Sequence, residues 1–359
     1  MVISIPREER QDSPEPIRHE PRPDVDPDRE AGVEAGGRGR RLLISIPALN
    51  EARTVGDVVR AIPGSIPGVD SIDVVVIDDG SQDATVAQAL AAGAGVLRHR
   101  KTRGVGAAFH TALDEAIQRQ ADLLVTLDAD GQFDPREIPR LIEPVLAGRA
   151  DFATASRFID PRLTPPMPLV KRWGNRFMSR WISNLVGSSL CDVSCGMRCY
   201  SRRALLRLGL LGDFTYTQEV ILSLAMHGAS IVEVPIRVGQ REHGESKVAS
   251  SVVRYGLKSA TIIFRAYRDY YPLRFFGSLS IGFLALAAPL AVFSIYHYAQ
   301  HGTFFPHTWA IVTAGACALL AAGMLHLGVT GDLLSRHRVY LEELLYRQRS
   351  RVVRGSRGR

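Results

Sequence analysis

The sequence predicts an α/β protein: a doubly wound, mostly parallel sheet domain followed by an α-helical membrane hairpin. Two observations carry this prediction. Buried strands alternate with amphipathic helices over residues 41–133, which is typical of parallel sheets. Two long apolar stretches follow, at 273–296 and 308–330, and each is close to the roughly 20 residues that cross a bilayer core as a helix. Residues 275–295 and 308–330 hold no charged side chain.

The first 40 residues form a polar leader. Residues 1–40 hold ten acidic residues and seven Arg but almost no apolar run, so the leader cannot bury enough apolar surface to offset chain entropy. We expect it to be disordered. No apolar segment of signal-peptide type follows Met1, so we do not interpret it as a secretory signal.

A soluble domain is expected over residues 41–250. Its strands are predicted at LLISIPALNE, IDVVVIDDGSQD (72–83), GVLRHR and ADLLVTLDADGQF (121–133). Helices are predicted between them, at 54–62 with Thr54 as its cap, at ATVAQALAAGAG, and at VGAAFHTALDEAIQRQ. Ligands of such sheets bind at the carboxyl ends of the strands, and three of these ends carry polar pairs, namely Asn50–Glu51, Asp78–Asp79 and Asp128–Asp130.

Each acidic pair has a structural alternative, because Asp-Asp-Gly-Ser also suits a turn with a helix cap and Asp-Ala-Asp also suits a polar loop. Three such ends at one sheet edge favour a functional interpretation. This edge would repel a phosphate-rich ligand unless a divalent cation intervened. The oxygen ligands of Asp128, Asp130 and the Gln132 amide suit Mg²⁺ or Mn²⁺.

Other nucleotide sites and zinc are disfavoured. The segment Gly104–Phe109 superficially resembles a dinucleotide fingerprint, but it follows the third strand and has Phe109 in place of the third glycine. No Gly-x-x-x-x-Gly-Lys-Ser/Thr phosphate loop occurs. The four cysteines include no C-x-x-C pair and no accompanying His, so they are most simply reduced thiols: Cys191, Cys195, Cys199 and Cys317.

Charge sets the orientation of the predicted hairpin. Arg residues flank both spans on the chain-end side, whereas the loop HYAQHGTFFPH holds no Lys or Arg, so the positive-inside rule places both termini and the domain in the cytoplasm. The final segment, 331–359, has eight Arg against three acidic residues. This basic cytoplasmic tail suits an anionic lipid surface better than nucleic acid. A buried hairpin in a soluble core is the alternative to the spans.

Several motifs in register resemble inverting family 2 glycosyltransferases of the GT-A fold. They are Ile-Pro47-Ala-Leu-Asn50-Glu51, Val-Ile-Asp78-Asp79-Gly-Ser, Arg103-Gly104-Val-Gly106 and Leu-Asp128-Ala-Asp130-Gly-Gln132. Ala-Ser-Arg157-Phe, Asp192-Val-Ser-Cys-Gly196-Met-Arg198, Glu219, Glu233-Val-Pro235 and Arg241-Glu-His-Gly244-Glu-Ser246-Lys247 narrow the resemblance to polyprenyl-phosphate glycosyltransferases similar to dolichol-phosphate mannose synthase. The likeness spans about residues 42–250, and bacterial members of this group also carry a two-helix anchor.

The resemblance implies transfer of a hexose from a UDP- or GDP-sugar to a polyprenyl phosphate, with Mg²⁺ or Mn²⁺, in cell-envelope glycan biosynthesis at the cytoplasmic face of the plasma membrane. It also accommodates a homo-oligomer, and no nucleic-acid partner is expected. It implies catalytic roles for Asp128, Asp130, Arg157 and Arg241, and it places Asp128, Asp130 and Gln132 at the metal. The nucleotide-sugar would contact Pro47, Asn50, Glu51, Asp78, Asp79, Gly104, Asp128 and Lys247. The acceptor phosphate would contact Arg157, Lys171, Arg172 and Ser246, while Glu219 would orient the sugar or pair with an Arg.

Three positions depart from related patterns. Leu169 stands where processive polysaccharide synthases have Gln before Arg172-Trp173, which argues against processivity. Val105 replaces a frequent Lys, and Leu49 replaces a frequent aromatic residue, so base stacking is expected to differ.

Two further segments mix apolar and basic residues. Residues 168–187 and 252–270 have the pattern of interfacial helices, with packing against the domain core as the alternative, and we assign 251–272 to a juxtamembrane helix.

Two other functions compete with this interpretation. One is a family member that acts on a glycolipid or polysaccharide, and the other is a non-catalytic membrane adaptor. The intact acidic residues and the Arg-x-x-Gly-x-Ser-Lys stretch favour an enzyme with an anionic acceptor.

Overall fold

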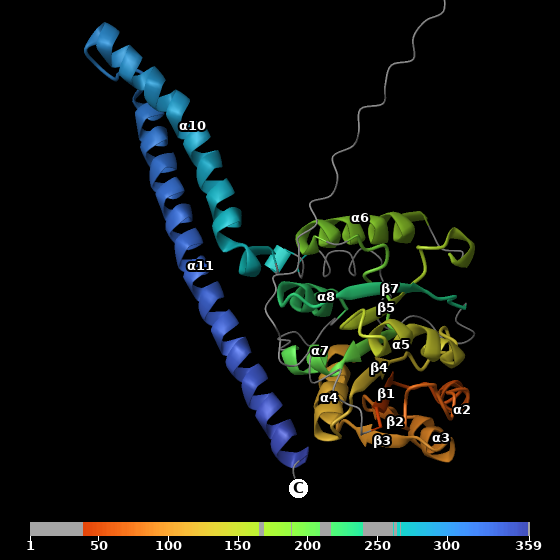
Figure 1. The fold of residues 1–359 in the computed structure, drawn as a ribbon. Helices are drawn as coiled ribbons and strands as arrows, with labels where there is room; N and C mark the ends of the chain where they lie inside the picture. The colour runs from red at the N-terminus through yellow and green to blue at the C-terminus, as the bar shows by residue number, and fades with distance from the viewer. Residues whose placement is uncertain are drawn as a thin grey trace, which may run out of the picture. The chain divides into compact units, whose positions relative to one another are not determined.

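A seven-stranded sheet forms the centre of the soluble region. The computed structural model describes residues 39–164, 169–187, 189–208, 217–239, 261, 264–265 and 267–357 (Figure 1). The strand order is β3-β2-β1-β4-β6-β5-β7. The strands are β1 (Arg41–Ala48), β2 (Ser71–Asp78), β3 (Gly95–Arg98), β4 (Leu123–Thr126), β5 (Phe152–Ser156), β6 (Arg198–Ser201) and β7 (Ile231–Pro235).

Helices cover both faces of the sheet. Side chains of α2, α3 and α5 share one buried cluster, and side chains of α4, α6, α7 and α8 share the other. The helices of this region are α2 (Val55–Arg60), α3 (Thr85–Ala91), α4 (Val105–Gln118), α5 (Ile138–Leu146), α6 (Leu169–Val186), α7 (Arg202–Arg207) and α8 (Thr217–Met226), with short 3₁₀ turns η1 (Pro135–Glu137) and η2 (Pro161–Leu163).

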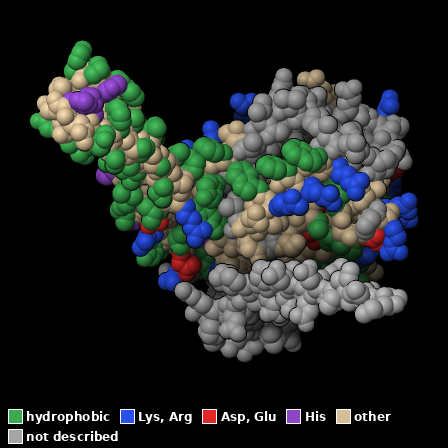
Figure 2. Space-filling view, turned by 90° about the horizontal axis from the view of Figure 1, so that it is seen from above, with side chains coloured by type: hydrophobic (Ala, Val, Ile, Leu, Met, Phe, Trp, Pro, Cys, Tyr) green, Lys and Arg blue, Asp and Glu red, His purple; other side chains and the backbone are tan. Residues whose placement is uncertain are grey.

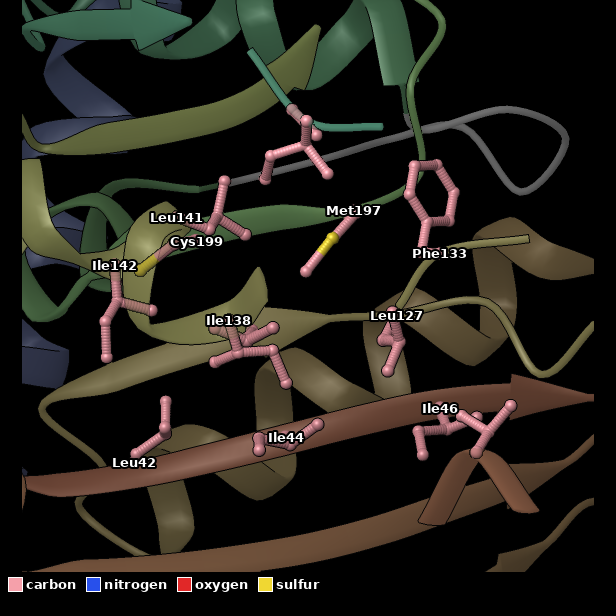
Figure 3. Packing of buried hydrophobic residues seen from close by; sticks show 14 of the residues in the cluster. Leu42, Ile44, Ile46, Leu127, Phe133, Ile138, Leu141, Ile142, Met197 and Cys199 are labelled. Atoms are coloured by element: carbon pink, nitrogen blue, oxygen red, sulfur yellow. The ribbon is translucent and has the colours of Figure 1, made fainter. Parts of the chain in front are cut away.

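Strand β1 shows how the sequence builds this three-layer core. Successive side chains of a strand point to opposite faces. Leu42, Ile44 and Ile46 accordingly lie in the cluster with α2, α3 and α5 (Figure 3). Leu43 lies in the cluster with α4. A strand that is buried on both faces reads as a continuous apolar run, which is why RLLISIPA was recognisable in the sequence.

Strand β6 makes the sheet mixed. The pairs β1–β2, β1–β4, β2–β3 and β5–β7 are parallel, but β6 pairs antiparallel with both β4 and β5. The mostly parallel α/β prediction is therefore confirmed. The predicted strand within 121–133 is shorter than expected, since β4 ends at Thr126 and leaves the acidic residues in the loop that follows.

The prediction for helix α2 is confirmed in part. Thr54 takes the N-cap position, but its side chain makes no cap hydrogen bond, and the helix ends at Arg60 rather than at residue 62. The backbone of Thr54 is already in the right-handed helical region, and the hydroxyl instead donates to the backbone oxygen of Glu51 at 3.4 Å.

Two apolar helices follow the sheet domain. Helices α10 (Pro272–His301) and α11 (Thr308–Arg357) are long and apolar enough to cross a membrane, and they lie side by side (Figure 1). Ser280 Oγ donates to the Ala321 oxygen between them at 2.8 Å. Most of their apolar side chains are exposed, and Figure 2 shows hydrophobic groups along the hairpin. Helix α11 also continues through most of the segment predicted as a tail.

Candidate active site

The carboxyl edge of the sheet brings the acidic motifs together. Strands β2, β1 and β4 are adjacent and parallel, so the loops that follow them leave from the same edge. Asn50 and Glu51 follow β1, Asp79 follows β2, and Asp128 and Asp130 follow β4. This is the convergence that the strand pattern predicted.

The loops after β1 and β2 are joined by hydrogen bonds. Asn50 has a positive φ of 51°, its backbone N–H donates to Ser81 Oγ at 2.8 Å, and its side-chain oxygen accepts from the Gln82 N–H at 2.8 Å. The Glu51 N–H donates to Thr85 Oγ1 at 2.9 Å. Both loops are therefore held in one arrangement by the chain's own contacts.

Asp78 and Asp79 organise the neighbouring loop. Buried Asp78 accepts from the Ser81 N–H at 3.0 Å, and its second oxygen forms an ion contact of 3.0 Å with Arg98 Nε. Asp79 accepts from the backbone N–H groups of Arg103 at 2.9 Å and Gly104 at 2.8 Å. Asp79 thus holds the segment that leads into α4, while Asp78 ties the turn after β2 to the end of β3.

His99 completes the Asp79 arrangement. Its Nδ1 lies 2.8 Å from Asp79 Oδ1, and its Nε2 lies 2.9 Å from Thr111 Oγ1 on α4. Gly104, with φ of 97°, supplies the left-handed backbone that turns the loop into this helix. The sequence motifs included Asp79 and Gly104 but did not point to His99.

The loop after β4 carries two carboxylates, Asp128 and Asp130. Asp130 is buried, and its Oδ1 accepts from the Gln132 N–H at 3.0 Å; Asp128 is half-buried. Within the described part of the chain, no three His, Cys, Asp or Glu side chains are grouped to hold a metal. Two carboxylates still fit Mg²⁺, which is usually bound by one or two carboxylates together with waters and substrate phosphates.

Arg157 faces a buried carboxylate. Its Nε lies 2.6 Å from Asp192 Oδ2 and its Nη2 lies 2.9 Å from Asp192 Oδ1, a bidentate geometry, and Nη2 also donates to Ser194 Oγ at 2.7 Å. The Asp192 side chain has no exposed surface, whereas 21% of the Arg157 side chain is exposed. The guanidinium is therefore fixed in orientation close to the end of β5.

Glu233 on β7 braces the loop that carries Asp192. Its carboxylate accepts from the backbone N–H groups of Cys191 at 2.8 Å and Asp192 at 2.7 Å. Burial raises the pKa of Glu233, although these two hydrogen bonds act in the opposite direction. The sequence motifs contained Glu233 without indicating this role, because its partners lie about 40 residues away in the chain.

The remaining predicted residues are placed as follows. Pro47 lies within β1, Arg172 is exposed on α6, and Glu219 is half-buried in the first turn of α8. The side chain of Lys171 lies outside the described structure, and so do Arg241, Gly244, Ser246 and Lys247, together with most of the predicted juxtamembrane helix.

Helix α6 presents aromatic and basic side chains to solvent. The rings of Trp173 and Phe177 stack at 5.8 Å between centroids and are 70% and 56% exposed. Arg172, Arg176 and Arg180 are also exposed, while Ile182 is buried in the core. The helix is therefore amphipathic, with an aromatic and basic outer face.

Comparison with known sequences establishes the family. Residues 43–209 match the model of Glycosyl transferase family 2. The chain is 31% identical over 239 residues to the undecaprenyl-phosphate mannosyltransferase of Micrococcus luteus, covering 62% of this chain and 93% of that protein. The chain belongs to glycosyltransferase family 2. This glycosyltransferase is also 30% identical over 225 residues to the polyprenol monophosphomannose synthase of Mycolicibacterium smegmatis, covering 60% and 83% of the two chains.

A solved structure supports the fold of the family 2 domain. The glucosyl-3-phosphoglycerate synthase of Mycobacterium tuberculosis, crystallised with Mg²⁺ and uridine diphosphate, superposes with a TM-score of 0.50 at 22% sequence identity. The match covers 67% of this chain and 82% of that one. At this identity the likeness concerns the GT-A type of fold alone.

Proposed function

We propose that this glycosyltransferase transfers a sugar, with inversion, from a UDP- or GDP-hexose to a polyprenyl phosphate. The observation that carries the proposal is the similarity of the whole catalytic region to two enzymes whose names specify polyprenyl phosphate acceptors. The acidic carboxyl edge, with Asp79, Asp128 and Asp130 on adjacent strands, gives that region a place for the donor.

The donor nucleotide is assigned to the loops after β1 and β2. Asn50 and Glu51 lie on loops that hydrogen bonds already hold, so nucleotide binding would cost little further ordering there. Asp79 would act chiefly by holding the Arg103–Gly104 backbone. We also assign Pro47, Asp78 and Lys247 to this donor site.

The donor diphosphate requires a counter-charge at an acidic edge. Asp128, Asp130 and the Gln132 amide would hold Mg²⁺ or Mn²⁺, which when bound neutralises the diphosphate leaving group as a Lewis acid. The buried position of Asp130, with its Oδ1 held by the Gln132 N–H, keeps this carboxylate oriented before a donor arrives.

The acceptor needs no general base. A phosphate monoester is already anionic at neutral pH, unlike a hydroxyl acceptor, so catalysis depends on placing its oxygen beside the anomeric carbon. Arg157 is suited to this because Asp192 and Ser194 fix its guanidinium. We assign the acceptor phosphate to Arg157 together with Lys171, Arg172, Arg241 and Ser246, and the sugar to Glu219.

The membrane would bring the lipid acceptor to the site. The exposed apolar surface of α10 and α11 favours insertion into a bilayer. Trp173 and Phe177 on α6 suit the lipid interface, where aromatic rings and Arg side chains are stabilised. We propose a multi-pass anchor in the plasma membrane with the catalytic domain and both termini in the cytoplasm.

The proposal is tested with the purified full chain in lipid vesicles. Radiolabelled UDP- and GDP-sugars are supplied with undecaprenyl phosphate in the presence of Mg²⁺ or Mn²⁺. We expect a lipid-soluble product that mild acid cleaves and that a chelator prevents from forming. No product across a broad donor panel would contradict the proposed function.

A further inference from the structure

The antiparallel strand β6 sets Gly196 against the acidic motif. Thr126 on β4 pairs with Arg198 on β6 in an antiparallel register. Continuing that register by two residues beyond the end of β4 and before the start of β6 places Gly196 opposite Asp128. The glycine and the first carboxylate of Asp128-Ala-Asp130 are therefore cross-strand neighbours.

There is no room for a side chain at Gly196. A Cβ atom built there would lie 3.0 Å from both Cγ and Oδ1 of Asp128 and closer still to Oδ2. These distances are shorter than van der Waals contact. The Asp128 carboxylate therefore occupies the space that any other residue at position 196 would fill.

The backbone on both sides is anchored and cannot easily retreat. Leu127 and Ala129, which flank Asp128, are buried in the same core cluster as Cys195 and Met197, which flank Gly196; Figure 3 shows Leu127 and Met197 in this core. Protein cores are close-packed and resist displacement. A collision would consequently be relieved at the movable end, the carboxylate of Asp128.

Two hydrogen bonds fix the Gly196 peptide itself. Thr126 Oγ1 donates to the Gly196 oxygen at 2.9 Å, and the fully buried Arg198 donates from Nε to the Cys195 oxygen at 2.8 Å. Arg198 Nη1 also donates to the Thr217 oxygen at 2.8 Å, which ties the segment to α8. The floor beneath the Asp128 carboxylate is thus rigid.

We propose that Gly196 is a positioning residue of the transfer reaction. Because glycine has no side chain, the Asp128 carboxylate can occupy the space beside it and take the orientation that holds the divalent cation and the donor. This inference rests on the metal role that the proposed function gives to Asp128. It predicts that a single methyl group at position 196 weakens metal binding without unfolding the domain.

The test compares Gly196→Ala with Gly64→Ala in the full chain. Gly64 is a matched control because it is exposed and a Cβ there would meet nothing within 4 Å. The probe is Mn²⁺ in the presence of UDP or GDP, measured by the electron paramagnetic resonance of free Mn²⁺. We expect Gly196→Ala to weaken Mn²⁺ binding by about 10- to 100-fold, the range seen when residues that orient metal ligands are changed.

The thermal unfolding midpoint distinguishes a positioning role of Gly196 from a purely structural role. We expect both alanine variants to unfold within a few degrees of the parent chain, with kcat reduced only in Gly196→Ala. If Gly196→Ala fails to fold, Thr126→Val replaces it, because that variant removes the hydroxyl that holds the Gly196 oxygen and is expected to weaken Mn²⁺ binding several-fold.

Unchanged Mn²⁺ affinity in the folded variant, or no Mn²⁺ binding by the parent chain, would overturn the inference. The proposed function fails separately. If the parent chain binds Mn²⁺ but transfers no sugar to any lipid phosphate, the proposed function is contradicted. In that case a loss of Mn²⁺ affinity in Gly196→Ala would still support the role of Gly196.

Discussion

The charged residues of the site are held by contacts within the chain. Asp79 accepts two backbone N–H groups, Asp130 accepts one, and Arg157 binds Asp192 through two nitrogens. Such contacts orient side chains before a ligand binds, and that lowers the ordering cost of binding and of reaching the transition state. At this scale the site is a set of preorganised groups.

Replacing Arg157 should destabilise the fold as well as the reaction. Arg157→Ala leaves the Asp192 carboxylate buried without its bidentate partner, and breaking a buried ion pair in this way costs about 3–5 kcal/mol. We expect a loss near the lower limit, about 3 kcal/mol, since Arg157 is partly exposed, together with loss of transfer activity. Urea unfolding at neutral pH measures the free energy.

The control for Arg157→Ala is Arg162→Ala. Arg162 also pairs with an aspartate, Asp160, but 88% of its side chain is exposed. Exposed ion pairs contribute about 0–1 kcal/mol, so this variant should unfold almost like the parent chain. Equal destabilisation by the two variants would contradict the account of the Arg157–Asp192 pair.

Asp130 is expected to be essential for turnover. Asp130→Asn replaces a buried carboxylate of the acidic motif by a neutral amide, which removes charge from the proposed metal site. Sugar transfer should fall below detection over a titration of Mg²⁺ and Mn²⁺. Asp134→Asn, four residues away and outside the motif, should retain activity. Unchanged turnover by Asp130→Asn would remove Asp130 from the metal site.

The sequence motifs predicted which residues gather at this edge, but not which of them contact one another. Arg157 and Asp192 are 35 residues apart, and their contact depends on β6, β5 and β7 lying side by side. Gly196 was visible only as part of a motif. Its closeness to Asp128 follows from an antiparallel register, whereas the alternation of strands and helices had indicated parallel pairing.

At the scale of elements, the strands with long apolar runs were recognisable and the short β6 was not. Strands β1 and β2 each have eight residues, and their apolar runs reveal them directly. Strand β6 has four residues, RCYS, including a buried arginine, so no hydrophobic period marks it. The predicted end of β4 was also too late, because the buried apolar residues Leu127 and Ala129 continue past the strand into the acidic loop.

Asp83 links the loop after β1 to the start of α3. Its carboxylate accepts from the Thr85 N–H at 3.0 Å at the start of α3, contacts the Thr85 hydroxyl, and accepts from the Ala52 N–H in the loop after β1 at 3.2 Å. Burial raises the pKa of Asp83, but these hydrogen bonds outweigh it and the pKa is lowered. The carboxylate therefore stabilises the folded state while it is ionised.

Asp83→Ala should cost about 1 kcal/mol of unfolding free energy at neutral pH, the usual contribution of such a helix-start carboxylate. Because the folded pKa is lowered, this stability is present above the unfolded value of about 3.9 and is lost as pH falls through the folded value. Urea unfolding at pH 7 and at pH 3 measures the difference between the variant and the parent chain.

The difference should be smaller at pH 3 than at pH 7. Asp57→Ala on α2 is the control, since the Asp57 side chain is 79% exposed and its carboxylate forms an ion pair with the exposed Arg60. It should change the free energy little at either pH. A cost of Asp83→Ala that does not diminish on acidification would argue against an ionised carboxylate as the link.

At the scale of the whole molecule, charge and hydrophobicity are segregated along the chain. The net charge is +7, the leader of residues 1–40 contributes −3, and residues 331–359 contribute +5. The apolar hairpin lies directly before that basic segment, and helix α11 runs through most of it. This arrangement fits a membrane surface and an anionic lipid substrate better than nucleic acid.

Changes to the outer face of α6 should affect the KM for the long lipid acceptor and not the KM for a short, soluble one. Trp173→Ala combined with Phe177→Ala removes two largely exposed rings, so the unfolding midpoint should not change by more than a few degrees. With undecaprenyl phosphate in vesicles, we expect KM to rise at least tenfold, since burying each ring is worth roughly 1.5–3 kcal/mol. A short, water-soluble polyprenyl phosphate should be used equally well by both proteins.

Leu90→Ala provides the control for this double variant, because Leu90 on α3 is another exposed apolar side chain, at 56%. It should leave KM for both acceptors unchanged. If the α6 variant loses activity equally with the short and the long acceptor, α6 does not act through the lipid phase.

The most direct test of the account compares two acceptors that differ only in the phosphate. The full chain is incubated with UDP- and GDP-sugars and vesicles that contain either undecaprenyl phosphate or undecaprenol, and lipid-linked product is identified by mass spectrometry. We expect an undecaprenyl-phosphate sugar of inverted anomeric configuration and no product from undecaprenol. Equal transfer to undecaprenol, or no transfer to the phosphate, would contradict the proposed function.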